Sequence, residues 1–292
     1  MQFRQDGADI PGDLINAVVR GDAVFLCGAG VSKRVGLPLF DDLTERVYGH
    51  IGETRAEAPA ERHAFARGEY DRVLRSLEKR TLLPRAQSRV RTAVAALLQP
   101  PNNVEFLDHL ALLELSRNAD GRPRLITTNF DTLFERAAAA GGFQDSPSHA
   151  GKAVPRPGGA NDEGILHLHG RLADGTLGLA ETDLILTSAD FGDAYLRDGW
   201  ASRYVEDRMR LNTLVLVGYA AEDPAMRLLL ETLDADRERF RDLKDIYAIE
   251  RQSEGSASIW RAKGINRRKL GSESIFLARP ARNQLSGSSS DA

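Results

Sequence analysis

The sequence of 292 residues contains a single cysteine, Cys27. One thiol cannot form a disulfide within the chain, and it cannot supply a four-cysteine zinc module. The sequence also lacks a basic segment followed by an apolar one at its start, and it has no long apolar run. Signal peptides and membrane-spanning helices need these features. We therefore expect a cytoplasmic protein without a membrane anchor.

Charge of one sign is also lacking, because 39 lysines and arginines face 42 aspartates and glutamates, giving a formal net charge of -3. No broad basic field is available to attract nucleic acid or anionic lipid, and we expect no direct nucleic acid binding. One local basic cluster, "WRAKGINRRKL" at 260–270, could contact a nucleic acid or a partner, but we interpret it as a last strand or exit segment.

Short apolar runs alternate with amphipathic segments along the chain. Helical periodicity occurs at 13–22, 39–52, 131–140, 193–210 and 224–240. Apolar or β-branched runs, typical of buried strands, occur at 23–30, 124–130, 165–170, 213–219 and 245–250. This alternation predicts an α/β fold with a Rossmann-like parallel sheet and helices on both faces.

The domain organisation follows from composition. We expect one catalytic domain over residues 1–278, with a charge-rich helical insertion at about 53–118 that is broken by prolines. The loop at 143–164 is rich in proline, glycine and serine, and long loops of this kind are usually mobile or functional. The polar tail at 279–292 is predicted to be disordered.

Ligands of open α/β sheets bind at the carboxyl ends of the strands, so the residues after each apolar run are the candidates. The first run ends in "GAGVS", where Gly28 and Gly30 would let backbone N–H groups approach a pyrophosphate. The alternative is a tight turn without a ligand. Lys33 occupies the position of the third glycine of the dinucleotide fingerprint, and no P-loop lysine follows.

The second run ends in "TTNFD", which contains Asn129 and Asp131. Asp131 could cap the following helix or contact a ligand, whereas Asn129 precedes the cap position and could face the cleft. The fourth run ends at Gly218.

The third run ends in "HLHG", and His167 and His169 share one face of a strand. A metal pair would need further ligands, and no cluster of cysteine or histidine accompanies them. His169 is then a working base or a satisfied strand-end histidine, and His167 is its structural neighbour. We therefore predict no metal site.

Taken together, "GAGVSKRVGLPLF", "TTNFD", "LHLHG" and "LVGYAAEDP" resemble the motifs of the sirtuin family, in family order, between about Asp13 and Ile265. The resemblance implies that Gly28, Ala29, Gly30 and Ser32 bind the pyrophosphate and ribose of NAD. It implies further that Asn129 and Asp131 serve the nicotinamide ribose pocket, that His169 is the catalytic base, and that Gly218 and Tyr219 lie near the adenosine.

The departures from sirtuin deacetylases are also informative. Asp41 follows "GLPLF" where deacetylases usually have arginine, and the zinc module is missing. The chain looks more like the bacterial sirtuin-like domains that destroy NAD in antiphage defence, although "GYAAED" is a loose match to their "GYSFxD". That resemblance implies homo-oligomers and a partner protein such as a defence ATPase or an Argonaute-type sensor.

Three functions remain in play. The first is an NAD glycohydrolase, with NAD as substrate, that releases nicotinamide and ADP-ribose as an NAD-depleting effector. The second is an NAD-dependent protein deacylase, which would need an acylated peptide to release nicotinamide. The third is a module that binds NAD or another nucleotide for assembly without turning it over.

Overall fold

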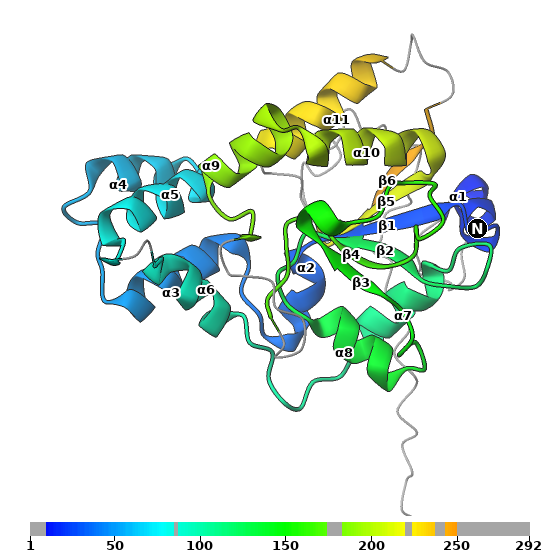
Figure 1. Ribbon diagram of the computed structural model, residues 1–292, viewed down its shortest axis with the longest axis horizontal. Coiled ribbons are helices and arrows are strands. Elements are labelled where there is room, and N and C mark those ends of the chain that lie inside the picture. The colour runs from blue at the N-terminus through cyan, green and yellow to red at the C-terminus, as the bar shows by residue number, and fades with distance from the viewer. Residues whose placement is uncertain (1–9, 85–86, 174–182, 220–223, 237–242, 250–292) are drawn as a thin grey trace, which may run out of the picture.

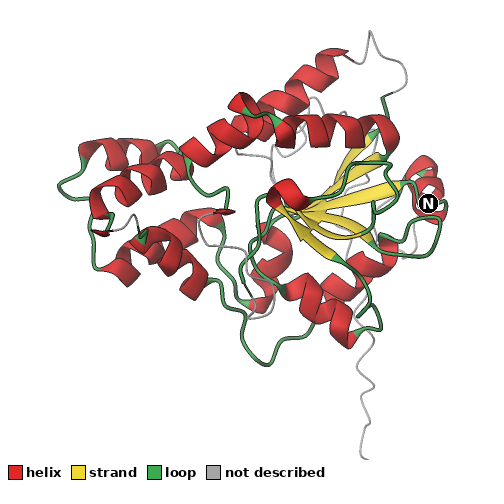
Figure 2. Cartoon of the chain, viewed as in Figure 1, coloured by secondary structure: helices red, strands yellow, loops and turns green. Residues whose placement is uncertain are grey.

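The computed structural model describes residues 10–84, 87–173, 183–219, 224–236 and 243–249. Within these ranges the strands form one parallel sheet in the order β3-β4-β2-β1-β5-β6, as Figure 1 and Figure 2 show. The strands are β1 (Ala23–Cys27), β2 (Arg124–Thr127), β3 (Ser148–Ala150), β4 (Gly164–His167), β5 (Thr213–Val217) and β6 (Ile246–Ile249).

The central strands end level with one another. Cys27 of β1 lies opposite Thr127 of β2 and Val217 of β5, and Thr127 in turn lies opposite His167 of β4. The residues that follow these four strands therefore emerge along the same edge of the sheet.

Helices cover both faces of the sheet, as the sequence predicts (Figure 1). The helices are α1 (Gly12–Val19), α2 (Ala29–Ser32), α3 (Phe40–Ile51), α4 (Pro59–Ala66), α5 (Tyr70–Thr81), α6 (Arg89–Leu97), α7 (Leu107–Leu115), α8 (Leu133–Ala140), α9 (Ser188–Phe191), α10 (Trp200–Leu211) and α11 (Pro224–Asp236). Short 3₁₀ turns occur at η1 (Lys33–Val35) and η3 (Gly151–Ala153), and a π-helical turn occurs at η5 (Gly192–Arg197). Within the described ranges, every helix is too short or too polar to cross a lipid bilayer.

Alternate residues of β1 pack into two separate cores, one on each face of the sheet. Val24 and Leu26 of β1 pack with α10 and α11, whereas Phe25 and Cys27 pack with α1, α7 and α8. Because both faces are covered, the strands read as continuous apolar runs. Burying one large apolar side chain in this way contributes about 1.5–3 kcal/mol.

A third core joins helices α3, α4, α5 and α6, which we call the helical unit; it lies to one side of the sheet in Figure 1. α3 precedes the expected insertion at about 53–118, while α7, inside that range, packs on the sheet. Buried Arg91 of α6 ties the unit to the segment before α10, donating to the carbonyl of Leu184 (2.7 Å) and to Asp190 (2.7 Å). The domain boundaries stay a prediction.

The five predicted strands are confirmed, and one strand was missed. β3 lies inside the loop predicted at 143–164, and it is an edge strand of three residues, too short for a period-two pattern. The tail at 279–292 lies outside the described residues.

The same loop contains a buried ion pair that fastens it to α10. The Arg208 guanidinium is fully buried and donates to both carboxylate oxygens of Asp162, to Asn212 (3.2 Å) and to Tyr204 (3.0 Å). Burial alone would raise the pKa of Asp162, but the hydrogen bonds and charge of Arg208 outweigh burial and lower it.

Asp162→Asn is expected to lower the free energy of unfolding by about 3–5 kcal/mol, because it leaves a buried guanidinium without its counter-charge. Urea denaturation at pH 7 measures the change. The matched control is Glu163→Gln, which removes only the partner of exposed Arg122 and should change stability by less than about 1 kcal/mol. Equal effects of the two substitutions would contradict this account of the loop.

A buried histidine lies on the other side of the sheet. His109 of α7 is 1% exposed, and its ring meets the Phe134 ring edge-on at 4.8 Å between centroids. Neither ring nitrogen has a hydrogen-bond partner among the described residues. Burial disfavours the imidazolium and lowers the pKa of His109 to about 4.

This histidine should make the protein sensitive to mild acid. The unfolded state binds the proton near pH 6.5 and the folded state only near pH 4, so stability is lost as the pH falls between these values. His109 alone should lower the free energy of unfolding by about 3 kcal/mol between pH 7 and pH 4. In His109→Leu that part of the pH dependence should vanish, as measured by urea denaturation at several pH values. Exposed His50→Leu should keep the wild-type slope, and an unchanged slope in His109→Leu would refute the prediction.

Candidate functional site

The loops after β1 and β5 pack backbone to backbone. The Gly28 N–H donates to Val217 O (3.0 Å) and the Gly30 N–H to Gly218 O (2.8 Å). A Cβ on Gly30 would lie 2.8 Å from Gly218 Cα, and Gly218 itself has φ +58°. The glycines of "GAG" thus serve a close approach of two loops, and the N–H of Ala29 is left without a partner among the described residues.

Asn129, Ser32 and Asp131 form a continuous hydrogen-bonded chain at the ends of β1 and β2. The Asn129 amide Nδ2 donates to Ser32 Oγ (3.0 Å) and to Gly28 O (3.2 Å). Ser32 Oγ donates in turn to Asp131 Oδ2 (2.9 Å). All three side chains are at most 7% exposed. The structure therefore brings together four of the predicted site residues, Gly28, Ser32, Asn129 and Asp131.

The same contacts decide which atoms remain for a ligand. Both amide hydrogens of Asn129 are engaged, whereas its Oδ1 has no partner in the described part of the chain. Asp131 Oδ1 accepts from the Leu133 N–H (3.1 Å), an Asx turn at the start of α8. Burial raises the pKa of the Asp131 carboxyl. Asn129 Oδ1 is thus an acceptor available at this edge.

His167 supports the Asn129 loop from behind. Its Nδ1 contacts the backbone carbonyl of Asn129 (2.9 Å), and its Nε2 contacts Glu135 Oε1 of α8 (2.8 Å). Burial raises the pKa of Glu135, but the charge and hydrogen bond of His167, together with Ser148, outweigh burial and lower the pKa to about 2. Among the described residues, no group of three or more histidines, cysteines or carboxylates is arranged to hold a metal ion.

His169 belongs to a second group of contacts. Its Nε2 lies 2.7 Å from the Tyr195 hydroxyl, and the Phe191 ring meets its imidazole edge-on at 5.2 Å. The side chain is 5% exposed. His169 follows His167 by two residues, so it emerges from the same edge of the sheet as Asn129.

Tyr219 packs against the core that β1 and β5 share with α10 and α11. Sequence reasoning missed Glu135, Arg171 and Tyr195. Arg171 is buried and donates to Glu135 (3.3 Å) and to Ser148. A charged residue directly after "HLHG" was the available signal for Arg171, whereas Tyr195 lies in a helical pattern that does not distinguish it.

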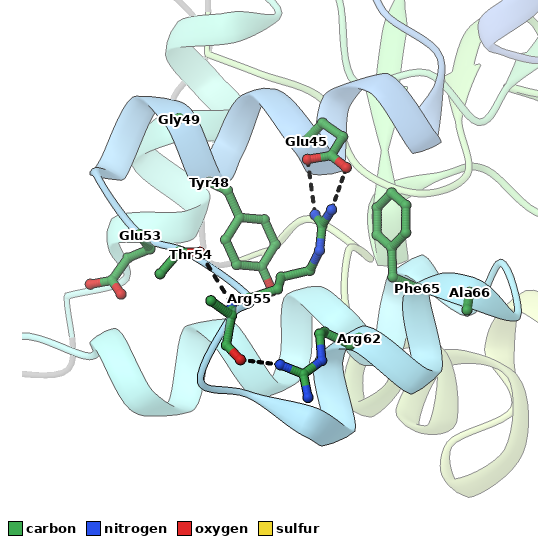
Figure 3. A pocket seen from close by; sticks show the side chains of 10 residues that line it. Glu45, Tyr48, Gly49, Glu53, Thr54, Arg55, Arg62, Phe65 and Ala66 are labelled. Carbon is green, nitrogen blue, oxygen red and sulfur yellow. Dashed lines mark hydrogen bonds and ion pairs between the residues drawn. The ribbon is translucent and has the colours of Figure 1, made fainter.

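A pocket of about 620 Å³ lies elsewhere, in the helical unit (Figure 3). The Arg55 guanidinium lies over the Tyr48 ring (4.9 Å) and the Phe65 ring (3.9 Å) and pairs with Glu45. None of its lining residues is a predicted site residue. The strand-end contacts rather than this hollow define the candidate site.

Known proteins resemble this chain in sequence and in structure. The uncharacterized protein y4cA of Sinorhizobium fredii (strain NBRC 101917 / NGR234) is 45% identical over 271 residues, which are 91% of this chain and 22% of that protein. The chain thus spans about a fifth of the length of that relative.

Two solved structures, a Sir2 homologue–ADP-ribose complex and a Sir2 homolog–NAD complex, are both 19% identical. The first has a TM-score of 0.38 and covers 89% of this chain and 90% of its own. The second has a TM-score of 0.37 and covers 90% of this chain and 89% of its own.

A family model, the SIR2-like domain, matches residues 123–267. This segment includes three strand ends of the candidate site, with Asn129, Asp131, His169 and Gly218. Residues 123–267, just under half of this chain, are therefore similar to the SIR2-like domain family.

Proposed function

We propose that this chain is an NAD glycohydrolase, which cleaves the nicotinamide–ribose bond to give nicotinamide and ADP-ribose. One observation carries the proposal: Asn129 Oδ1, at the edge where the parallel strands end, has no partner among the described residues, whereas the other polar atoms of its buried group are hydrogen-bonded. Open α/β sheets bind ligands at this edge. The SIR2-like domain and the sirtuin-like motifs support NAD as that ligand.

Asn129 would hold the nucleophile. The reaction passes through an oxocarbenium-like state at the ribose, and the leaving nicotinamide is already cationic and needs no general acid. An acceptor that receives one O–H of the attacking water turns the oxygen lone pair toward the anomeric carbon and leaves the second O–H for the base. Because both Nδ2 hydrogens are engaged, the amide cannot flip, and Oδ1 stays the atom presented.

His169 would act as the base that takes the proton of this nucleophile, since an imidazole titrates near neutral pH. Asp131 would contribute through Ser32, which it orients by accepting a hydrogen bond from the Ser32 hydroxyl. A negative charge close to the ribose would also favour the developing cation.

The nucleotide end of the substrate would lie over the loops of β1 and β5. Gly28, Gly30 and Gly218 bring these loops together and keep side chains out of the way. The Ala29 N–H is the amide of this turn that a pyrophosphate oxygen could accept from. The Ser32 hydroxyl already donates to Asp131, so it would donate to the substrate only by giving up that partner. Tyr219 would face the adenosine.

Removing the base should abolish most of the activity. His169→Ala should lower the rate of nicotinamide release from NAD by ~10²–10⁴-fold. Asn129→Ala, which misplaces the nucleophile, should lower the rate by about 10²-fold. Nicotinamide and ADP-ribose are followed by liquid chromatography, and circular dichroism checks the fold. Exposed His50→Ala and Asn16→Ala are matched controls that should keep the wild-type rate.

Because both residues serve one step, the double variant should lose far less than the product of the two single losses. Release of nicotinamide only in the presence of an acylated peptide would instead favour a deacylase. Folded His169→Ala and Asn129→Ala proteins with wild-type rates would refute the site.

The biological role proposed with this activity is an NAD-depleting effector of antiphage defence. Unrestrained hydrolysis would starve the host cell, so the isolated chain should be weakly active until it assembles or meets a partner such as a defence ATPase or an Argonaute-type sensor. Size-exclusion chromatography with light scattering, run beside the NAD assay, measures both properties. A monomer that hydrolyses NAD at its full rate without additions would contradict this restraint.

A further inference from the structure

We propose that Tyr195 is a positioning residue of the candidate site, which fixes the His169 imidazole through its phenol hydroxyl. The catalytic part of this proposal rests on the proposed function. The geometric part rests on contacts between two buried side chains, His169 after β4 and Tyr195 before α10.

The imidazole of His169 packs against two neighbouring aromatic rings, Phe191 and Tyr195. Tyr195 is 4% exposed, and its hydroxyl lies 2.7 Å from His169 Nε2. Phe191 and Tyr195 stack on each other at 24°, and both rings meet the imidazole nearly at right angles. Two edge-on ring contacts and a hydrogen bond at Nε2 together restrict the orientation of the imidazole.

The backbone that carries Tyr195 departs from a regular α-helix. η5 is a π-helical turn of six residues between α9 and α10, and such turns occur frequently at functional sites. The wide turn buries Ala194 and Tyr195 while Leu196 is 78% exposed. Ser202 Oγ donates to the Tyr195 carbonyl (2.6 Å), which satisfies a backbone acceptor in this irregular turn.

The hydrogen bond with Tyr195 fixes the orientation of the His169 imidazole. An imidazole without a fixed partner exchanges between two tautomers and two ring orientations, and only one of these presents the basic lone pair to the substrate. The Tyr195 hydroxyl holds Nε2 at 2.7 Å, so the imidazole cannot rotate without breaking this contact. The phenol thus prepares the base before substrate arrives.

Tyr195→Phe tests this role, because it removes the hydroxyl and keeps the ring. We expect kcat for NAD cleavage to fall by about 10- to 100-fold while KM for NAD changes less than about twofold. The matched control is Tyr204→Phe, another buried tyrosine whose hydroxyl accepts from Arg208 instead. It should leave kcat unchanged in protein that remains folded.

A second measurement does not depend on activity. Long-range ¹H–¹⁵N NMR spectra of the six histidine rings report their tautomers, and the His169→Ala spectrum assigns the His169 signals. Tyr195→Phe should shift the His169 Nε2 resonance, whereas Tyr204→Phe should not. An unshifted resonance, or an unchanged kcat in an active enzyme, would overturn the proposal. If the wild-type protein cleaves no NAD, the proposed function fails, and the NMR result still decides whether Tyr195 holds His169.

Discussion

The side-chain amide of Asn129 is the interaction on which the candidate site depends. By donating to Gly28 O and Ser32 Oγ, it joins the loop after β2 to the loop after β1. The neighbouring contacts extend from this junction. Ser32 Oγ donates to Asp131, and Asp131 accepts from the Leu133 N–H in the turn that begins α8. His167 Nδ1 contacts the Asn129 carbonyl. A glutamine or an aspartate in its place would not supply the same two donors at the same reach.

The buried polar group behind the site explains why His167 is next to a working residue without sharing its role. Glu135, with its lowered pKa, remains a carboxylate at neutral pH between His167 and Arg171. These groups take their hydrogen bonds mostly from one another, so they hold the loop rigidly at little net gain in stability. The two histidines of "HLHG" thus divide their tasks: His167 fixes the backbone, and His169 meets the aromatic rings of Phe191 and Tyr195.

The fold and the positions of the candidate residues could be predicted because they follow from local rules. Buried parallel strands are short apolar runs, and their carboxyl ends are marked here by Gly28, Asn129, His169 and Gly218. The partners of those residues could not be predicted. Glu135 and Tyr195 lie in helical patterns in which a carboxylate or a buried tyrosine is ordinary, and only the packing brings them to the site. Similarly, the glycines of "GAG" predict an approach to phosphate, and the local pattern does not predict that their backbones also approach Gly218.

Arg91 couples the position of the helical unit to the position of Tyr195. Its guanidinium donates hydrogen bonds to Glu78 inside the helical unit, to the Leu184 carbonyl and to Asp190. Asp190 also forms the capping box at the start of α9. α9 continues directly into η5, the turn that presents Tyr195 to His169. A movement of α6 would therefore also displace α9. The helical unit cannot move away from the sheet without either breaking the hydrogen bonds of Arg91 or displacing Tyr195, which contacts the His169 imidazole.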